Sequence, residues 1–308
     1  MTDTAQNILK TLGYFDLFEY PLTKAEIYLF ISEDICHEAF ENILNTLVKD
    51  KSVFILDEFY AIQNNCQLAT RRRKGNELAA RQLKTANRVA RLLARFPYVK
   101  GIAVSGSLSK NFATEKTDID FFIVTTANRL WIARTILHLY KKLTFLTGRQ
   151  NWFCMNYFVD EACMEIVEKN IFTAIEIFTL LPMQGKSSLT AFAENNNWIK
   201  NYFPLHVFNS ATAPEIKNGF LRTIIENFFN GSIGDTIDKK LMAVTQRRWQ
   251  KKVQHNRLNS RGGSMGMVVD RHFSKPDPKN FQEKVVEGYR IKVQQLLQQK
   301  NKPVSLIS

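Results

Sequence analysis

The chain has 308 residues, of which 45% are hydrophobic and 23% are charged, a composition that excludes a disordered protein. It contains no apolar run near the roughly 20 residues that a membrane-spanning helix needs, and its N-terminus lacks the pattern of a signal peptide. The four cysteines show no Cys-x-x-Cys spacing, so we expect buried free thiols in a cytoplasmic protein.

The net charge of +13 is unevenly distributed. Residues 239–300 hold 15 Lys and Arg against 4 Asp and Glu, and a second basic cluster occupies Arg71–Lys74. Positive fields of this kind favour polyanions, although a solvated helix face explains each cluster equally well. We therefore expect polyanion contact at the basic C-terminal region.

Residues 1–63 are predicted to form a winged-helix-like domain of three helices and a hairpin. The helices are expected at residues 4–18, from 23 onward and at 36–48, and the strands at 53–56 and 59–62. Thr23 and Glu26 have the spacing of a capping box at the second helix. The third helix carries Glu38 and Glu41, and an acidic helix is badly suited to a phosphate backbone. We therefore expect protein contact or packing, not sequence-specific DNA binding.

Three further regions follow along the chain. Residues 64–96 are predicted as a linker helix, 97–205 as the core and 206–308 as a basic helical region. In the core, we expect strands at 101–105, 119–124 and 151–159, a paired strand at 163–167, and helices at 127–146 and 172–181, the last closed by Pro182. The C-terminal helices are expected at 215–229, 233–254 and 281–299. This mixture of elements predicts an α+β fold.

A long loop is predicted between the last two helices, at residues 255–280. Its cationic side chains could clamp an anionic substrate, or the loop could be a solvated surface segment. The side chains concerned are those of Arg257, Arg261, Arg271, His272 and Lys275.

Two carboxylates open the second core strand, Asp118 and Asp120. Their spacing places them on one face of a strand, where like charges destabilise each other unless a cation lies between them. Mg²⁺ is the usual ion for such a pair, and Mn²⁺ is an alternative. The preceding Gly106-Ser107 turn offers backbone N–H groups and a hydroxyl to a polyphosphate. A plain turn followed by two solvated acids is the structural alternative.

This stretch, GSLSKNFATEKTDID, resembles the nucleotidyltransferases of the DNA polymerase beta superfamily. The resemblance implies that Asp118 and Asp120 hold Mg²⁺ and that Gly106 and Ser107 bind a nucleoside triphosphate. The segments NRLWIAR, CMNYFVDE, FTAIEIFTLLPM and NNNWIKNYFP also resemble a bacterial group of predicted nucleotidyltransferases with a winged-helix-like N-terminal part. That match runs over residues 12–204.

The superfamily pattern normally supplies a third carboxylate from a neighbouring strand, but residues 151–159 contain only Asn156 at a suitable position. Asparagine is neutral and cannot act as a base. Glu165, on the next segment, is the other candidate for this role. We expect Lys110 and Arg129 to contact the phosphates.

Two functions are compatible with this pattern. The first is an Mg²⁺-dependent nucleotidyltransferase that moves a nucleoside monophosphate from an NTP to a hydroxyl on a small molecule, a protein or an RNA end. The second is a catalytically impaired nucleotide-binding or regulatory protein, which uses the winged helix and the basic C-terminus for partner contact.

Overall fold

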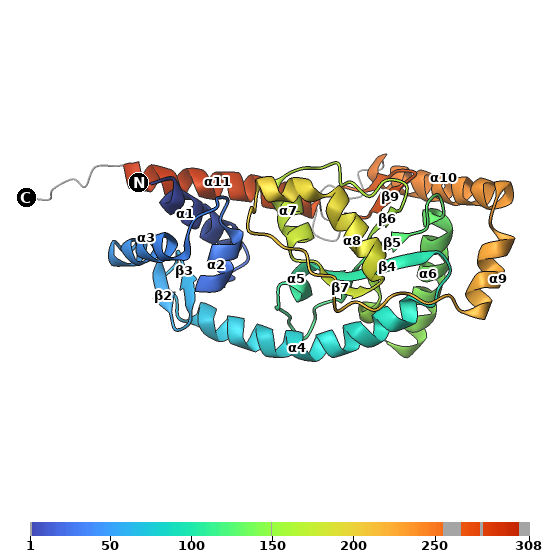
Figure 1. The fold of residues 1–308 in the computed structure, drawn as a ribbon, viewed down its shortest axis with the longest axis horizontal. Helices are drawn as coiled ribbons and strands as arrows, with labels where there is room; N and C mark the ends of the chain where they lie inside the picture. The colour runs from blue at the N-terminus through green and yellow to red at the C-terminus, as the bar shows by residue number, and fades with distance from the viewer. Residues whose placement is uncertain (1, 149, 255–265, 278–279, 302–308) are drawn as a thin grey trace, which may run out of the picture.

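A computed structural model describes residues 2–148, 150–254, 266–277 and 280–301 of the chain. They form an α+β fold in which helices flank a six-stranded mixed sheet, beside a smaller N-terminal unit (Figure 1). The strand order is β7-β4-β5-β6-β9-β8. The strands are β4 (Val99–Ser105), β5 (Asp120–Thr125), β6 (Cys154–Asp160), β7 (Leu181–Gln184), β8 (Val268–Val269) and β9 (Phe273–Lys275).

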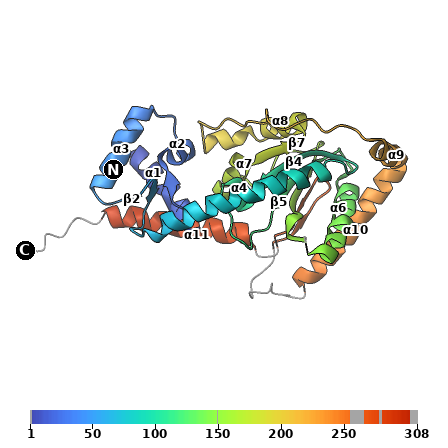
Figure 2. The same ribbon diagram turned by 90° about the horizontal axis from the view of Figure 1, so that it is seen from below.

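The central strand β5 is buried on both faces, so its apolar residues run without interruption. Phe121 and Ile123 face the layer formed by helices α4 (Gln67–Leu93) and α6 (Leu130–Thr144). Phe122 and Val124 face the layer of α7 (Ile171–Phe178) and α8 (Lys186–Asn195). Figure 2 shows these helices on the two sides of the sheet. By the same alternation, the Asp120 side chain belongs to the α7 side.

The N-terminal unit contains three helices and a three-stranded antiparallel sheet of order β1-β3-β2. Its elements are α1 (Asp3–Asp16), β1 (Leu22–Thr23), α2 (Lys24–Phe30), α3 (His37–Lys49), β2 (Phe54–Leu56) and β3 (Phe59–Ala61). The predicted capping box of Thr23 and Glu26 is confirmed. The core of this unit is continuous with the α7 layer, where the rings of Phe30 and Phe178 lie 4.5 Å apart. Its assignment as a winged helix and the proposed domain boundaries stay predictions.

The basic cluster at the start of α4 ties this helix to the N-terminal unit. Arg72 is only 2% exposed, lies 2.7 Å from the Glu26 carboxylate and stacks 3.7 Å above the Tyr20 ring. Arg73 forms an ion pair with Glu58, which lies in the turn between β2 and β3. These guanidinium groups have anionic partners within the chain, so they stabilise the packing of α4 on the N-terminal unit.

Pro182 lies inside a strand and does not close a helix as predicted. Helix α7 ends at Phe178, and β7 begins at Leu181. Proline cannot donate a ladder hydrogen bond, but β7 is an edge strand and tolerates it. The sequence pattern also missed most of α8, whereas the short helical stretch that it predicts at residues 194–203 contains the 3-10 helix at Asn197–Asn201.

The neighbour of β6 in the sheet comes from the C-terminal region. Residues 163–167 were predicted to pair with β6, but they contribute only an isolated bridge between Asp160 and Cys163. β9 pairs there instead, with Phe273 opposite Val159. The predicted loop at 255–280 therefore contains two strands within its described part.

In its described part, the C-terminal region also contains the helices α9 (Phe220–Phe228), α10 (Ser232–Gln254) and α11 (Phe281–Asn301). The first begins later than the predicted residue 215. Helix α10 packs against α6, and α11 returns to pack on α1 (Figure 1). In the described part of the chain, no helix is long and apolar enough to cross a membrane.

The four cysteines are all free thiols, as predicted, but they are not all buried. Cys36, Cys66 and Cys163 are exposed, and Cys154 is half-buried.

Candidate functional site

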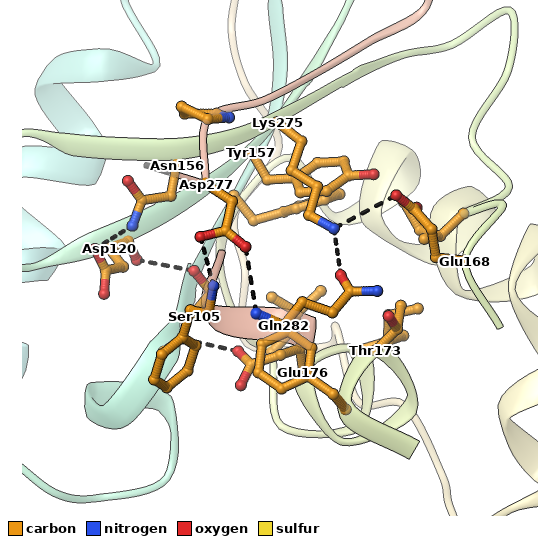
Figure 3. Close-up of a pocket in the computed structure, with 18 of the residues that line it drawn as sticks. Ser105, Asp120, Asn156, Tyr157, Glu168, Thr173, Glu176, Lys275, Asp277 and Gln282 are labelled. Atoms are coloured by element: carbon orange, nitrogen blue, oxygen red, sulfur yellow. Dashed lines mark hydrogen bonds and ion pairs between the residues drawn. The ribbon is translucent and has the colours of Figure 1, made fainter. Parts of the chain in front are cut away.

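A pocket of about 530 Å³ opens at the end of the sheet where β4 ends and β5 and β6 begin (Figure 3). Four of the predicted site residues line it, namely Gly106, Asp118, Asp120 and Asn156. The antiparallel register sets Ser105 opposite Asp120, and the parallel register sets Asp120 opposite Cys154. The sheet therefore brings three chain segments, far apart in sequence, to one place.

Asp120 is the most perturbed carboxyl group of the pocket. Burial raises its pKa to about 6, and the nearby carboxylates of Asp118 and Glu176 add to this increase. The Asn156 side chain donates a hydrogen bond to Oδ1 of Asp120 over 2.5 Å, and the Cys154 thiol donates to Asn156. Asn156 thus orients the carboxylate without adding the negative charge of a third acid.

Gly106 is required where β4 turns into the short helix α5 (Gly106–Ser109). Its φ of +71° lies in the left-handed region that favours glycine, and a Cβ there would lie 2.6 Å from Oδ2 of Asp120. The backbone N–H of Gly106 has an anionic partner. In this structure it donates to Oε2 of Glu176 over 3.3 Å.

Glu176 on α7 lines the pocket and pairs with Lys110, which itself lies outside the lining. The Lys110 ammonium lies 2.8 Å from Oε1 of Glu176 and 3.0 Å from the Gly106 carbonyl oxygen. Lys110 and Gly106 were predicted to bind phosphate, and here a carboxylate engages both donors. The sequence pattern missed Glu176, although one signal was present: it is the only charged residue of the apolar helix IFTAIEIF.

The pocket is strongly acidic. Five carboxylates line it, those of Asp118, Asp120, Glu168, Glu176 and Asp277, together with the Lys275 ammonium. Such a surface repels a polyphosphate unless cations are bound with it. Within the described ranges, no group of three or more His, Cys, Asp or Glu residues is arranged to hold a metal ion. The donor set at hand is a pair of carboxylates, which suits a hard cation that takes its other ligands from substrate phosphates and water.

The segment between β9 and α11 forms the far wall of the pocket. The Lys275 ammonium lies 3.4 Å from the Glu168 carboxylate and also donates a hydrogen bond to the side-chain oxygen of Gln282 (Figure 3). The Asp277 carboxylate accepts hydrogen bonds from two backbone N–H groups in the first turn of α11. The distances are 2.8 Å from Phe281 and 3.2 Å from Gln282. Part of the basic C-terminal region therefore belongs to the site.

Of the other cationic residues predicted in this loop, Arg257 and Arg261 lie outside the described residues. His272 is engaged elsewhere, with Nδ1 3.1 Å from both oxygens of the buried Asp160. Arg271 is exposed and does not line the pocket.

Arg129 does not reach the pocket, contrary to the prediction that it contacts phosphate. Its guanidinium lies 2.5 Å from Asp235 and donates to the carbonyl oxygens of Phe229 and Gly231. It therefore fixes the turn between α9 and α10 against the start of α6.

Glu165 and Ser107 also lie outside the lining. Glu165 is half exposed and pairs with Lys169 at 2.6 Å, so it does not supply the third carboxylate. Ser107 is in α5, but Ser105 is the serine that lines the pocket.

Comparison with known proteins identifies one domain. Residues 86–176 match the family model described as a nucleotidyltransferase domain. This segment runs from α4 to Glu176 itself and contains the glycine turn and the aspartate pair. No curated protein and no solved structure matches the chain.

Proposed function

Because residues 86–176 form a nucleotidyltransferase domain, we propose that the chain transfers a nucleoside monophosphate from an NTP to a hydroxyl group in the pocket around Asp118 and Asp120. The observation that carries the proposal is the close approach of the Gly106 turn to Asp120, where a Cβ on Gly106 would lie 2.6 Å from the carboxylate. A glycine turn held against a carboxylate at one sheet end gives a phosphate and a bound cation adjacent positions.

The aspartate pair would hold Mg²⁺, with Mn²⁺ as an alternative ion. When bound, such an ion orients the triphosphate and lowers the pKa of the attacking hydroxyl. Asn156 keeps Asp120 in position through its hydrogen bond.

The phosphates would take over the two donors that Glu176 now occupies. The Gly106 N–H and the Lys110 ammonium are both aimed at its carboxylate, and a phosphate oxygen can replace that oxygen at the same donors. The aromatic rings of Phe122, Tyr157 and Phe172, which also line the pocket, provide an apolar wall for the base.

The transfer itself forms a bond between the acceptor oxygen and the α-phosphorus and breaks the bond from that phosphorus to the bridging oxygen, so that pyrophosphate leaves. The acceptor hydroxyl must lose a proton. Glu176, once released from Lys110 by the phosphate, is the carboxylate that we assign to receive it. It would thereby replace the third acid that β6 lacks.

A second candidate is favoured by one observation, the amide of Asn156 at the position expected for a carboxylate. The chain would then bind nucleotide without transferring it, and the N-terminal unit and basic C-terminal region would contact a partner. Nucleotide binding by the wild type, with no label transfer to any acceptor, would support this reading.

The experiment uses NTPs labelled at the α- or the γ-phosphate, with Mg²⁺ and a cell extract as the source of acceptors. We expect α-label, and not γ-label, to be transferred, and the Asp118→Asn/Asp120→Asn variant to lose at least about 100-fold in rate. Equal transfer by the two proteins would overturn the assigned site. Transfer of the γ-label would overturn the reaction class.

A further inference from the structure

A second cavity, of about 1080 Å³, lies between α6 and α10, outside the transferase pocket. The two helices run side by side (Figure 2). Five basic residues line this groove: Arg134, Lys141, Lys142, Arg248 and Lys251. Its described lining contains no carboxylate.

Four of the five basic residues that line the groove are not paired with a carboxylate of the described residues. Across the described ranges, no ion pair forms at Arg134, Lys141, Lys142 or Arg248. The basic cluster of α4 differs, because its Arg72 is paired with a glutamate. Cations that gather along a groove without anionic partners create a field that favours an extended polyanion.

Arg134 lies at the floor of the groove between two indole rings. Its guanidinium carbon is 5.4 Å from the Trp131 ring and 5.1 Å from the Trp249 ring. Burial lowers its pKa to about 10, which leaves the group charged at neutral pH. Its Nε and the Nε2 of His138 are buried and have no hydrogen-bond partner among the described residues. Buried polar atoms usually have a hydrogen-bond partner, so these two atoms can take one from water or from a ligand in the groove.

The groove also exposes aromatic and apolar surface. Phe145 is 59% exposed and Leu139 is 56% exposed, and the half-buried Trp249 lies among the basic residues. Cations that follow a groove, interleaved with rings on which bases can stack, characterise binding sites for single-stranded nucleic acid. A duplex keeps its bases stacked internally and cannot use these rings.

We infer that the groove between α6 and α10 binds single-stranded RNA or DNA, with its cations on the phosphodiester backbone and Trp249 and Phe145 against the bases. The inference does not depend on the proposed transfer reaction. It specifies the polyanion that the basic C-terminal region would bind.

The test measures fluorescence anisotropy of a labelled single-stranded RNA of about 12 nucleotides, a length within the usual site size of such grooves. The full chain is used, at several salt concentrations, beside a DNA duplex and vesicles rich in anionic lipid. We expect the single strand to bind more tightly than the duplex. The Lys142→Glu/Arg248→Glu variant should bind the single strand with a Kd at least tenfold higher. The slope of log affinity against log salt concentration should become shallower by about 0.7 for each phosphate contact that is lost.

The matched control is Lys84→Glu/Arg88→Glu, which makes the same charge change at two exposed positions on α4. It should bind nearly as the wild type does. Trp249→Leu should weaken single-strand binding at unchanged salt dependence, provided that circular dichroism shows an intact fold. Equal loss in the charge variant and the control would overturn the inference, as would binding of vesicles but not of RNA.

Discussion

The Lys110 ammonium lies 2.8 Å from the Glu176 carboxylate, and the same carboxylate accepts a hydrogen bond from the Gly106 N–H. Under the proposed function, Glu176 thus occupies the donors that a triphosphate would need. The pair is only partly exposed, 15% for Lys110 and 26% for Glu176, so a phosphate would have to replace the carboxylate to reach these donors.

Glu176→Gln should separate nucleotide affinity from turnover. A neutral amide competes less well for Lys110, so we expect the Kd for MgATP to fall severalfold in calorimetry. If Glu176 accepts the proton, the rate of label transfer should fall at least about 100-fold, within the range for general-base removal. The control is Glu165→Gln, the same change at a half-exposed residue outside the pocket. A weaker Kd at an unchanged rate would contradict both roles.

Gly106→Ala should damage the site through two effects. The positive φ is strained for alanine, and the new Cβ would press on Oδ2 of Asp120 at 2.6 Å. We expect a loss of about 1–3 kcal/mol in the free energy of unfolding and loss of nucleotide binding. Gly148→Ala isolates the first effect, because its φ is +66° but nothing lies within 4 Å of the added Cβ. Denaturant titration of both variants measures the difference; equal losses would show that the contact with Asp120 contributes nothing.

Asp120 should make stability depend on pH in a defined direction. Its pKa of about 6 exceeds the ordinary 3.8, so the folded state binds this proton more tightly than the unfolded state does. The contribution of Asp120 to stability therefore falls as pH rises from about 4 to 6. Above pH 6, Asp120→Asn should be more stable than the wild type by about 1–3 kcal/mol, and this gain should vanish near pH 4.

Urea denaturation at a series of pH values measures this effect. Asp118→Asn, at an exposed position, is the matched control and should change stability less. Mg²⁺ should reduce the advantage of Asp120→Asn, since a bound cation favours the ionised carboxylate. A gain that is constant from pH 4 to pH 8 would argue against the burial of charge as its cause.

Arg72→Ala should destabilise the joint between α4 and the N-terminal unit far more than Arg73→Ala does. Arg72 is 2% exposed, and its removal leaves Glu26 without its cation, a change that costs about 3–5 kcal/mol for buried pairs. Arg73 pairs with Glu58 at the surface, where such pairs contribute about 1 kcal/mol or less. Thermal unfolding of the two variants provides the comparison, and similar losses would be inconsistent with this assignment.

The two central strands and the glycine turn could be predicted because their signals are local. Residues 101–105 and 119–124 are apolar runs bounded by Gly106 and by the aspartates, and both lie within the observed strands or next to their ends. The Thr23 capping box is likewise encoded within four residues. The family match to residues 86–176 confirms the predicted nucleotidyltransferase resemblance at the level of this domain.

The rest depends on contacts between distant segments, for which a single sequence carries little signal. β9 is three residues long and pairs with β6 on one side and with β8 on the other. Glu176 reaches the site because α7 packs beside Gly106, seventy positions away in the chain. The sequence position of Arg129 suggested a phosphate ligand. In the structure, its guanidinium instead donates hydrogen bonds to the Phe229 carbonyl oxygen and to the Asp235 carboxylate at the start of α10.

Under the proposed function, Asp118, Asp120 and Gly106 form one site for a divalent cation and a nucleotide. Crystals grown with Mn²⁺ and a non-hydrolysable NTP analogue test it directly, because Mn²⁺ scatters anomalously. We predict an anomalous peak about 2.0–2.5 Å from oxygens of both aspartates, with phosphate oxygens at the Gly106 N–H and the Lys110 ammonium in place of Glu176. Nucleotide bound elsewhere, or bound with Glu176 still on Lys110 and no peak at the aspartates, would contradict the account.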